Sequence, residues 1–160
     1  MSLEALGDLY KEVILDHYQN PRNNRPLGDP SVTTEGYNPV CGDQVQLQLE
    51  VQDGVIAQIS LSGTGCAISQ AAASMMTEAV KGRKIDDADT LARIFRDFMT
   101  SNDAQPDELG DLEVLEGVRK FPVRVKCATL SWNTLQEAIK ELREGKKRGR
   151  LVVEDGPSGP

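Results

Sequence analysis

The sequence contains few of the residues that most directly reveal a protein's chemistry, with three cysteines and one histidine among 160 residues. An odd number of cysteines does not make a closed set of disulfides, so the thiols serve metal binding, sulfur chemistry or plain burial. Basic residues are also scarce: 18 stand against 25 acidic ones, for a net charge of −7. This balance argues against general affinity for nucleic acid or anionic membranes.

Long apolar runs are missing as well. No stretch approaches the roughly 20 apolar residues of a membrane span. The first 18 residues interleave acidic side chains with apolar ones, which is not the pattern of a signal peptide. We therefore expect a cytoplasmic protein with reduced thiols that binds neither a membrane nor nucleic acid.

The length of the chain suggests a single domain with a genuine core. Residues 3–18 place apolar side chains at three- and four-residue steps and predict an amphipathic helix. A Pro/Asn/Gly-rich stretch follows, with one short strand expected around residues 31–35. Together with the alternating segments that come next, this predicts an α+β fold over residues 1–145 and a mobile C-terminal tail over residues 146–160.

Residues 44–61 predict a β-hairpin, because two runs of alternating polar and apolar residues flank an Asp-Gly pair at 53–54. A two-residue loop would pair Gln52 with Val55 and mix the polar and apolar faces of the two strands. A three-residue loop pairs Val51 with Val55, keeps the faces matched and puts glycine at the left-handed position. We therefore predict the three-residue loop.

This register gathers chemically active residues at the open end of the hairpin. Asp43 is predicted to lie opposite Gly63 and Cys41 opposite Gly65, with directly paired Cα atoms about 4.5–5.5 Å apart. Cys41 and Asp43 share one face, because side chains alternate along a strand with a period of two. Cys66 follows next in the chain, so two thiols and one carboxylate are expected to lie close together.

The second and third cysteines both lie at predicted helix starts. A helical pattern begins at Cys66, and another begins near Cys127 after an extended segment over residues 121–126. The free N–H groups and the dipole of a helix N-terminus favour thiolate over thiol. Arg124 and Lys126 add positive charge beside Cys127.

Three thiolates and a carboxylate suit a tetrahedral zinc site, with the ligands Cys41, Asp43, Cys66 and Cys127. The alternative is that three scattered cysteines are inert small hydrophobes. Spacing alone does not decide between the two, since the sequence has no CxxC pair. The hairpin geometry and the two helix starts are the observations that favour a site.

Several segments of the sequence resemble the IscU/NifU/SufU family of iron–sulfur cluster assembly proteins. They are NPVCGDQV at 38–45, SGTGCAISQAAASMM at 62–76, FPVRVKCATLSW at 121–132 and, in the first helix, ILDHYQNPRN at 14–23. The resemblance covers about residues 4–145. It implies a small antiparallel sheet of about three strands, covered on one face by helices, with metal or a cluster bound by Cys41, Asp43, Cys66 and Cys127.

Two departures distinguish branches of this family. Scaffold members usually carry histidine just before the third cysteine, where this chain has Lys126, a protonated ammonium that does not readily replace imidazole as a ligand. The stretch before the third cysteine also holds an acidic insert over residues 101–120. Both features resemble the SufU type, which binds zinc and accepts sulfur from a pyridoxal-phosphate-dependent cysteine desulfurase.

The resemblance therefore implies zinc-dependent sulfur transfer in iron–sulfur cluster biogenesis. Cys41 would receive persulfide sulfur from a SufS-like desulfurase as a thiolate nucleophile and pass it to downstream cluster assembly proteins. A zinc-bound thiolate is poorly nucleophilic, so Cys41 would leave the ion first, while Asp43, Cys66 and Cys127 hold it. Arg124 is expected to orient Asp43 or the departing thiolate.

Two other functions stay open. The protein is alternatively an IscU-like scaffold on which a [2Fe–2S] cluster forms, with Asp43 weakening the fourth bond so that the cluster leaves. A third reading makes the zinc purely structural, although such sites are usually closed by cysteine and histidine. The only histidine, His17, is expected to be a helix-end or core group, and Met75, Met76 and Trp132 are expected to pack in the core.

Overall fold

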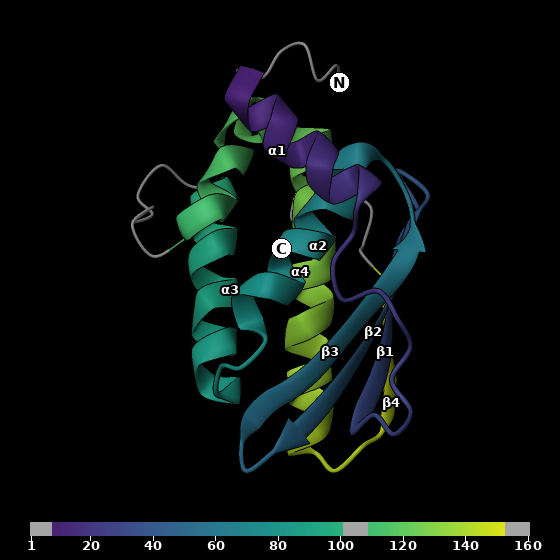
Figure 1. Cartoon of the computed structure of the whole chain (residues 1–160). Helices are drawn as coiled ribbons and strands as arrows, with labels where there is room; N and C mark the ends of the chain where they lie inside the picture. The colour runs from purple at the N-terminus through teal and green to yellow at the C-terminus, as the bar shows by residue number, and fades with distance from the viewer. Residues whose placement is uncertain (1–7, 101–108, 153–160) are drawn as a thin grey trace.

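The computed structural model describes residues 8–100 and 109–152. Its elements are, in chain order, α1 (Asp8–Gln19), β1 (Val32–Asn38), β2 (Asp43–Gln52), β3 (Val55–Thr64), α2 (Ala67–Val80), α3 (Ile85–Thr100), the 3-10 helix η3 (Gly110–Lys120), α4 (Pro122–Arg143) and β4 (Arg148–Val152). Helices α2 and α4 pack against the sheet, and α3 packs against α4 on the side away from it (Figure 1). The predicted α+β class is confirmed. No helix in these two ranges is long and apolar enough to cross a membrane.

The sheet has four strands in the order β3-β2-β1-β4, in place of the three or so that the sequence predicts. Strands β1, β2 and β3 are antiparallel neighbours, and β4 adds to the free edge of β1 in parallel. The added strand comes from the predicted mobile tail, so that prediction is wrong for residues 148–152, and residues 153–160 lie outside the described part. Gly145, with a φ of 76°, turns the chain back after α4, which itself lies against β1.

The contact that seats β4 involves a buried carboxyl group on α4. The Glu141 side chain is buried, and its Oε1 accepts a hydrogen bond from the Thr34 hydroxyl at 2.6 Å. Gly149 of β4 lies directly over this carboxylate, because a methyl group at Gly149 would overlap its atoms. Burial raises the pKa of Glu141, with Glu137 adding to the shift and the bond from Thr34 opposing it.

Replacing Glu141 with glutamine is expected to change how stability depends on pH. Because the pKa is raised in the folded state, the folded protein keeps a proton that the unfolded chain releases near pH 4.5, and the free energy of unfolding falls as pH rises through the raised pKa. Glu141→Gln removes this loss. The free energy of unfolding of the variant, relative to that of the wild type, should therefore rise as the pH is raised from about 5 to about 8. Urea unfolding at both pH values measures it, with exposed Glu113→Gln as the control; a pH-independent difference would contradict it.

Strands β2 and β3 form the predicted hairpin, but the predicted loop is wrong. The loop has two residues, Asp53 and Gly54, and Gln52 pairs with Val55. Both loop residues have positive φ, at 54° and 76°, which is the geometry of a type I′ turn. An Asp-Gly pair is among the preferred sequences for this turn, so local turn chemistry outweighs the simple matching of faces.

A β-bulge then restores the matched faces. The register shifts between Glu50 and Val51, so Ala57 has no partner on β2. Beyond this point the apolar residues of the two strands lie opposite one another. Leu47 lies opposite Leu61, and both side chains are buried. At the open end Gln44 therefore pairs with Thr64, two residues along β3 from the predicted partner Ser62, with consequences for the thiols described below.

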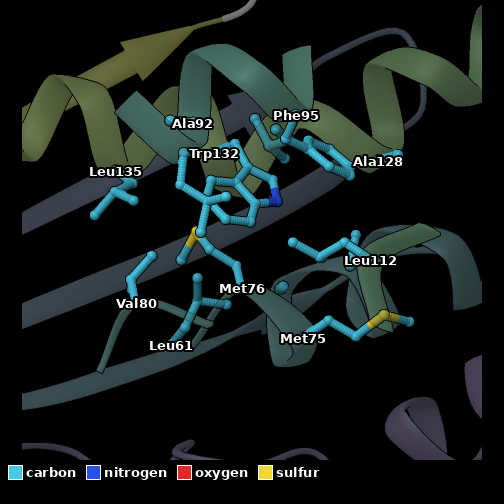
Figure 2. Close-up of a cluster of buried hydrophobic side chains, with 14 of the residues drawn as sticks. Leu61, Met75, Met76, Val80, Ala92, Phe95, Leu112, Ala128, Trp132 and Leu135 are labelled. Carbon is cyan, nitrogen blue, oxygen red and sulfur yellow. The ribbon is translucent and has the colours of Figure 1, made fainter. Parts of the chain in front are cut away.

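The core lies between the sheet and the helices (Figure 2). Trp132 stacks on Phe95 with ring centroids 5.2 Å apart and an angle of 24° between the ring planes. Figure 2 shows Met75, Met76 and Leu61 on the side of the indole that faces the sheet and α2. All five side chains are buried, which confirms the predicted packing of both methionines and the tryptophan.

The remaining expectations concern the first helix and the acidic insert. Helix α1 covers the described part of the helix predicted over residues 3–18, and residues 1–7 lie outside the described part. His17 near its end is buried, with Nδ1 2.8 Å from the Ser74 hydroxyl oxygen, as expected of a packed helix-end group. Of the insert, residues 101–108 also lie outside the described part. Leu112 and Leu115 of η3 are buried in the core.

Candidate metal centre

Cys41 lies in the loop that joins β1 to β2, between the paired residues Asn38 and Asp43. Its backbone is held from inside the turn by Asn38: the Val40 N–H donates to Asn38 Oδ1 at 3.1 Å, and the Gly42 N–H donates to the Asn38 carbonyl at 2.8 Å. Cys41 is half-buried and does not pair with the third strand, so its predicted place opposite Gly65 is wrong. A thiol on such a loop is able to move without breaking the sheet.

Asp43 is fully buried at the start of β2. Its Oδ1 accepts a hydrogen bond from the Cys66 N–H at 3.1 Å. Its Oδ2 has no hydrogen-bond partner among residues 8–100 and 109–152. Gly65 permits this close approach, because a methyl group there would overlap Oδ1; the register shift thus brings Asp43 beside Gly65 in place of the predicted Gly63.

Cys66 begins a helix, as predicted. It is the N-cap residue of α2, and its Sγ accepts a hydrogen bond from the Ser69 N–H at 3.4 Å. Hydrogen bonding lowers the pKa of Cys66 to about 6, chiefly through the Cys127 thiol and also through the Ser69 and Ile68 N–H groups. Burial and the charge of Asp43 act in the opposite direction and are outweighed. The local hydrogen bonds therefore favour the thiolate form of Cys66.

The segment before Cys127 is helical, which corrects the predicted extended conformation of residues 121–126. Helix α4 begins at Pro122, after the N-cap residue Phe121. Proline is well suited to the first turn of a helix, because its φ fits and its missing N–H is not needed there. Cys127 therefore lies in the second turn of α4 and not at its first residue.

Cys127 is buried and lies among the other predicted ligands. Its Sγ is 3.1 Å from the Cys41 Sγ and 3.7 Å from the Val123 carbonyl oxygen one turn earlier. Hydrogen bonding with Cys66, together with burial, raises the pKa of Cys127.

Three of the four predicted ligands form one compact group. The Sγ atoms of Cys41 and Cys127 and a carboxylate oxygen of Asp43 all lie within 4.8 Å of one another. The Cys66 Sγ is outside this group. Cys66 nevertheless contacts two of its members, because its N–H donates a hydrogen bond to Asp43 and its thiol is hydrogen-bonded with Cys127. The assignment of all four as metal ligands remains a prediction.

The donor set fits a borderline-soft cation such as zinc. A fully buried carboxylate oxygen without a hydrogen bond is costly, and a cation would satisfy it. Nearby thiols supply the sulfur donors that zinc prefers. Positive charge comes from Arg124, whose Nη1 donates to Cys127 Sγ at 3.8 Å, a bond that raises the pKa of Arg124. The expectation that Arg124 orients Asp43 or a departing thiolate remains a prediction.

One residue of the site was not predicted from the sequence. Asn38 is fully buried, and it holds the Cys41 loop through both its side chain and its carbonyl. The available signal was local: asparagine before proline is typical of a turn in which the side-chain oxygen accepts a backbone N–H two residues later.

Comparison with known proteins relates most of the chain to one family. Residues 9–148 match the NifU-like N terminal domain family. The chain is 45% identical over 141 residues to the zinc-dependent sulfurtransferase SufU of Bacillus subtilis (strain 168), covering 87% of this chain and 95% of that protein. It is 44% identical over 142 residues to the iron–sulfur cluster assembly scaffold protein IscU of Streptococcus pyogenes serotype M1, covering 88% of each.

Solved structures agree with these matches. The fold superposes with a TM-score of 0.80 on a candidate iron–sulfur cluster assembly scaffold protein for the SUF system from Fervidobacterium islandicum AW-1, at 27% identity over 87% of this chain and 99% of that one. A NifU-like protein (N-terminal) from Brucella abortus shares the fold, with a TM-score of 0.79. The chain therefore belongs to the NifU-like N-terminal domain family, the family of IscU and SufU.

Proposed function

We propose that the protein is a zinc-dependent sulfur acceptor in iron–sulfur cluster assembly. It takes sulfur onto Cys41 from the persulfide of a pyridoxal-phosphate-dependent cysteine desulfurase and passes it to downstream assembly proteins. The similarity to a zinc-dependent sulfurtransferase over most of both chains supports this proposal. The carrying observation is that Cys41 is the one cysteine of the three that neither belongs to a helix nor caps one, and that it lies on the β1–β2 loop next to a buried thiol and a buried carboxylate.

The three thiols differ in their freedom to react. Cys127 is buried within α4, and the Cys66 sulfur is tied to the first turn of α2 by its capping bond. Cys41 is half-buried on the β1–β2 loop, where movement breaks no strand pairing. Loops on a rigid scaffold are where reactive groups are commonly presented. Cys41 is therefore the thiol best placed to meet the persulfide of a partner.

The transfer is a thiol exchange that balances without an added oxidant. The Cys41 thiolate attacks the outer sulfur of the partner's persulfide, a new S–S bond forms at Cys41, and the bond within the partner's persulfide breaks. The partner cysteine leaves as a thiolate. Arg124, whose guanidinium lies close enough to all three thiols for their charges to raise its pKa, stabilises the anionic sulfur at the site.

Asp43, Cys66 and Cys127 would hold the zinc ion, with Cys41 as the fourth ligand at rest. When bound, the ion would keep the thiols deprotonated and protect them from oxidation. Movement of the Cys41 loop leaves the other three residues in place, because Asp43 belongs to β2, Cys127 belongs to α4 and Cys66 caps the first turn of α2. The cytoplasmic location and the lack of nucleic-acid and membrane binding remain predictions.

Replacing Cys41 with alanine is expected to abolish sulfur acceptance without unfolding the protein, because the loop is anchored by Asn38 and not by the thiol. The full chain is loaded with zinc and incubated anaerobically with a cysteine desulfurase and cysteine, and mass mapping then locates added sulfur. The wild type should carry persulfide on Cys41 only when the desulfurase is present. Equal sulfur acceptance by Cys41→Ala would contradict the assignment.

A second function, assembly of a [2Fe–2S] cluster on the three cysteines, is supported by the 44% identity to an IscU scaffold protein. The same experiment separates the two functions. Absence of persulfide on every cysteine, together with a stable visible absorption after anaerobic addition of iron and sulfide, would favour the scaffold.

A further inference from the structure

The buried side chain of Asn38 has an unused donor beside the centre. Its Oδ1 accepts from the Val40 N–H, which fixes the orientation of the amide and leaves Nδ2 as the NH2 group. Nδ2 is buried and has no hydrogen-bond partner within the described chain. A buried amide donor is costly to leave unpaired, so it needs an acceptor nearby.

The facing residue offers that acceptor. Asn38 and Asp43 are directly paired across the antiparallel strands β1 and β2. Because they are directly paired, their side chains point to the same face of the sheet, and both are fully buried. Directly paired residues have Cβ atoms about 4.5–5.5 Å apart. Asp43 Oδ2 is the matching acceptor without a partner in the described residues, while Oδ1 is taken by the Cys66 N–H.

Asn38 Nδ2 and Asp43 Oδ2 make no hydrogen bond with each other in the structure. We infer that Asn38 is a positioning residue of the metal centre, whose side-chain amide donates to Asp43 Oδ2 when a cation binds and so orients the carboxylate toward that cation. A carboxylate oxygen has two acceptor positions, so Oδ2 takes the amide hydrogen and still binds the ion. Asp43 is then held at Oδ1 by Cys66 and at Oδ2 by Asn38. The same side chain accepts from the Val40 N–H in the loop of Cys41, so Asn38 contacts both the loop that carries Cys41 and the strand that carries Asp43. This inference rests on the proposed zinc site.

Two substitutions separate the donor from the loop contact. In Asn38→Ser the hydroxyl still accepts from the Val40 N–H, as serine does in similar turns, but it is too short to reach Asp43. Asn38→Ala removes both contacts. Asn133→Ser is the matched control, because Asn133 is also buried and its side chain accepts from Arg96 on α3, away from the sheet.

The experiment is a competition titration of the full chain with zinc and a chromophoric chelator. Asn38→Ser and Asn38→Ala are both expected to bind zinc about 10–100-fold more weakly, as is typical when a group that orients a metal ligand is removed. Asn133→Ser should bind like the wild type. Substitution with cobalt gives an independent readout, since a misplaced carboxylate shifts the visible bands of the ion.

Wild-type zinc affinity in Asn38→Ser, with a loss only in Asn38→Ala, would leave Asn38 as a loop anchor and overturn the inference while the proposed function stands. A wild type that binds no zinc would overturn the centre and the inference together. If Asn38→Ser does not fold, the wild type alone decides: exchange of the Asn38 side-chain amide protons should slow on zinc binding, and unchanged exchange would overturn the inference.

Discussion

Replacing Cys127 with serine is expected to lower zinc affinity by more than about 100-fold and leave the fold intact. Structural zinc sites contribute about 10–16 kcal/mol of apparent binding free energy, so one of four ligands accounts for roughly 3–4 kcal/mol, and each 1.4 kcal/mol is about tenfold. The serine hydroxyl is a poor zinc ligand. It fits the space of the thiol and is able to donate to the Val123 carbonyl, which lies 3.7 Å from the present sulfur.

The measurement is zinc competition on the full chain, with thermal unfolding of the zinc-free protein as the check on folding. Ser131→Ala is the matched control, since Ser131 is buried one turn farther along α4 and its hydroxyl has no partner in the described part of the chain. Unchanged zinc affinity in Cys127→Ser would make this cysteine an inert core residue, the alternative that spacing alone leaves open.

Alternation of side chains predicted the hairpin but not its register. The alternation shows which residues of each strand are buried, as at Leu47 and Leu61, but it does not show where one strand takes an extra residue. The bulge at Ala57 allows the favoured Asp-Gly turn and matched faces together. The prediction assumed a regular ladder without a bulge, and under that assumption only the three-residue loop keeps the apolar faces of the two strands matched.

The fourth strand depends on tertiary contacts that no local pattern shows. Residues 148–152 form a short segment with two arginines, which shows no clear strand pattern. They become a strand because α4 places Glu141 where only glycine fits above it, and because β1 has a free edge. Helix α3, by contrast, was predictable: Leu91, Phe95 and Phe98 recur at helical spacing and are all buried.

The candidate site was predictable in its members more than in its geometry. Motif resemblance named Cys41, Asp43, Cys66 and Cys127, and three of them share one compact group. Residues 121–126 were predicted to be extended, although their proline is well suited to a first helical turn. The place of Asn38 beside these residues was not predicted, because the turn that asparagine favours before proline does not show that its side chain is buried next to Asp43.

Replacing Gly65 with alanine is the second substitution for which we expect a large effect, although it changes no proposed ligand. The new methyl group would overlap Asp43 Oδ1 and lie 3.0 Å from both Asp43 Cγ and Ser69 Oγ. Cys66 binds that same Oδ1 through its backbone N–H. Because strand pairing and α2 fix the backbone on either side, the carboxylate has to turn away and give up this bond.

We expect Gly65→Ala to weaken zinc binding by about 10–100-fold, the usual result of disturbing a group that orients a ligand, and to lower the free energy of unfolding by about 1–3 kcal/mol through overpacking. Zinc competition and urea unfolding measure the two effects. Gly28→Ala is the control, because nothing lies within 4 Å of the added methyl group there. Lost stability with unchanged zinc affinity would show that Asp43 binds no metal, since the methyl group displaces that carboxylate before any other group of the centre.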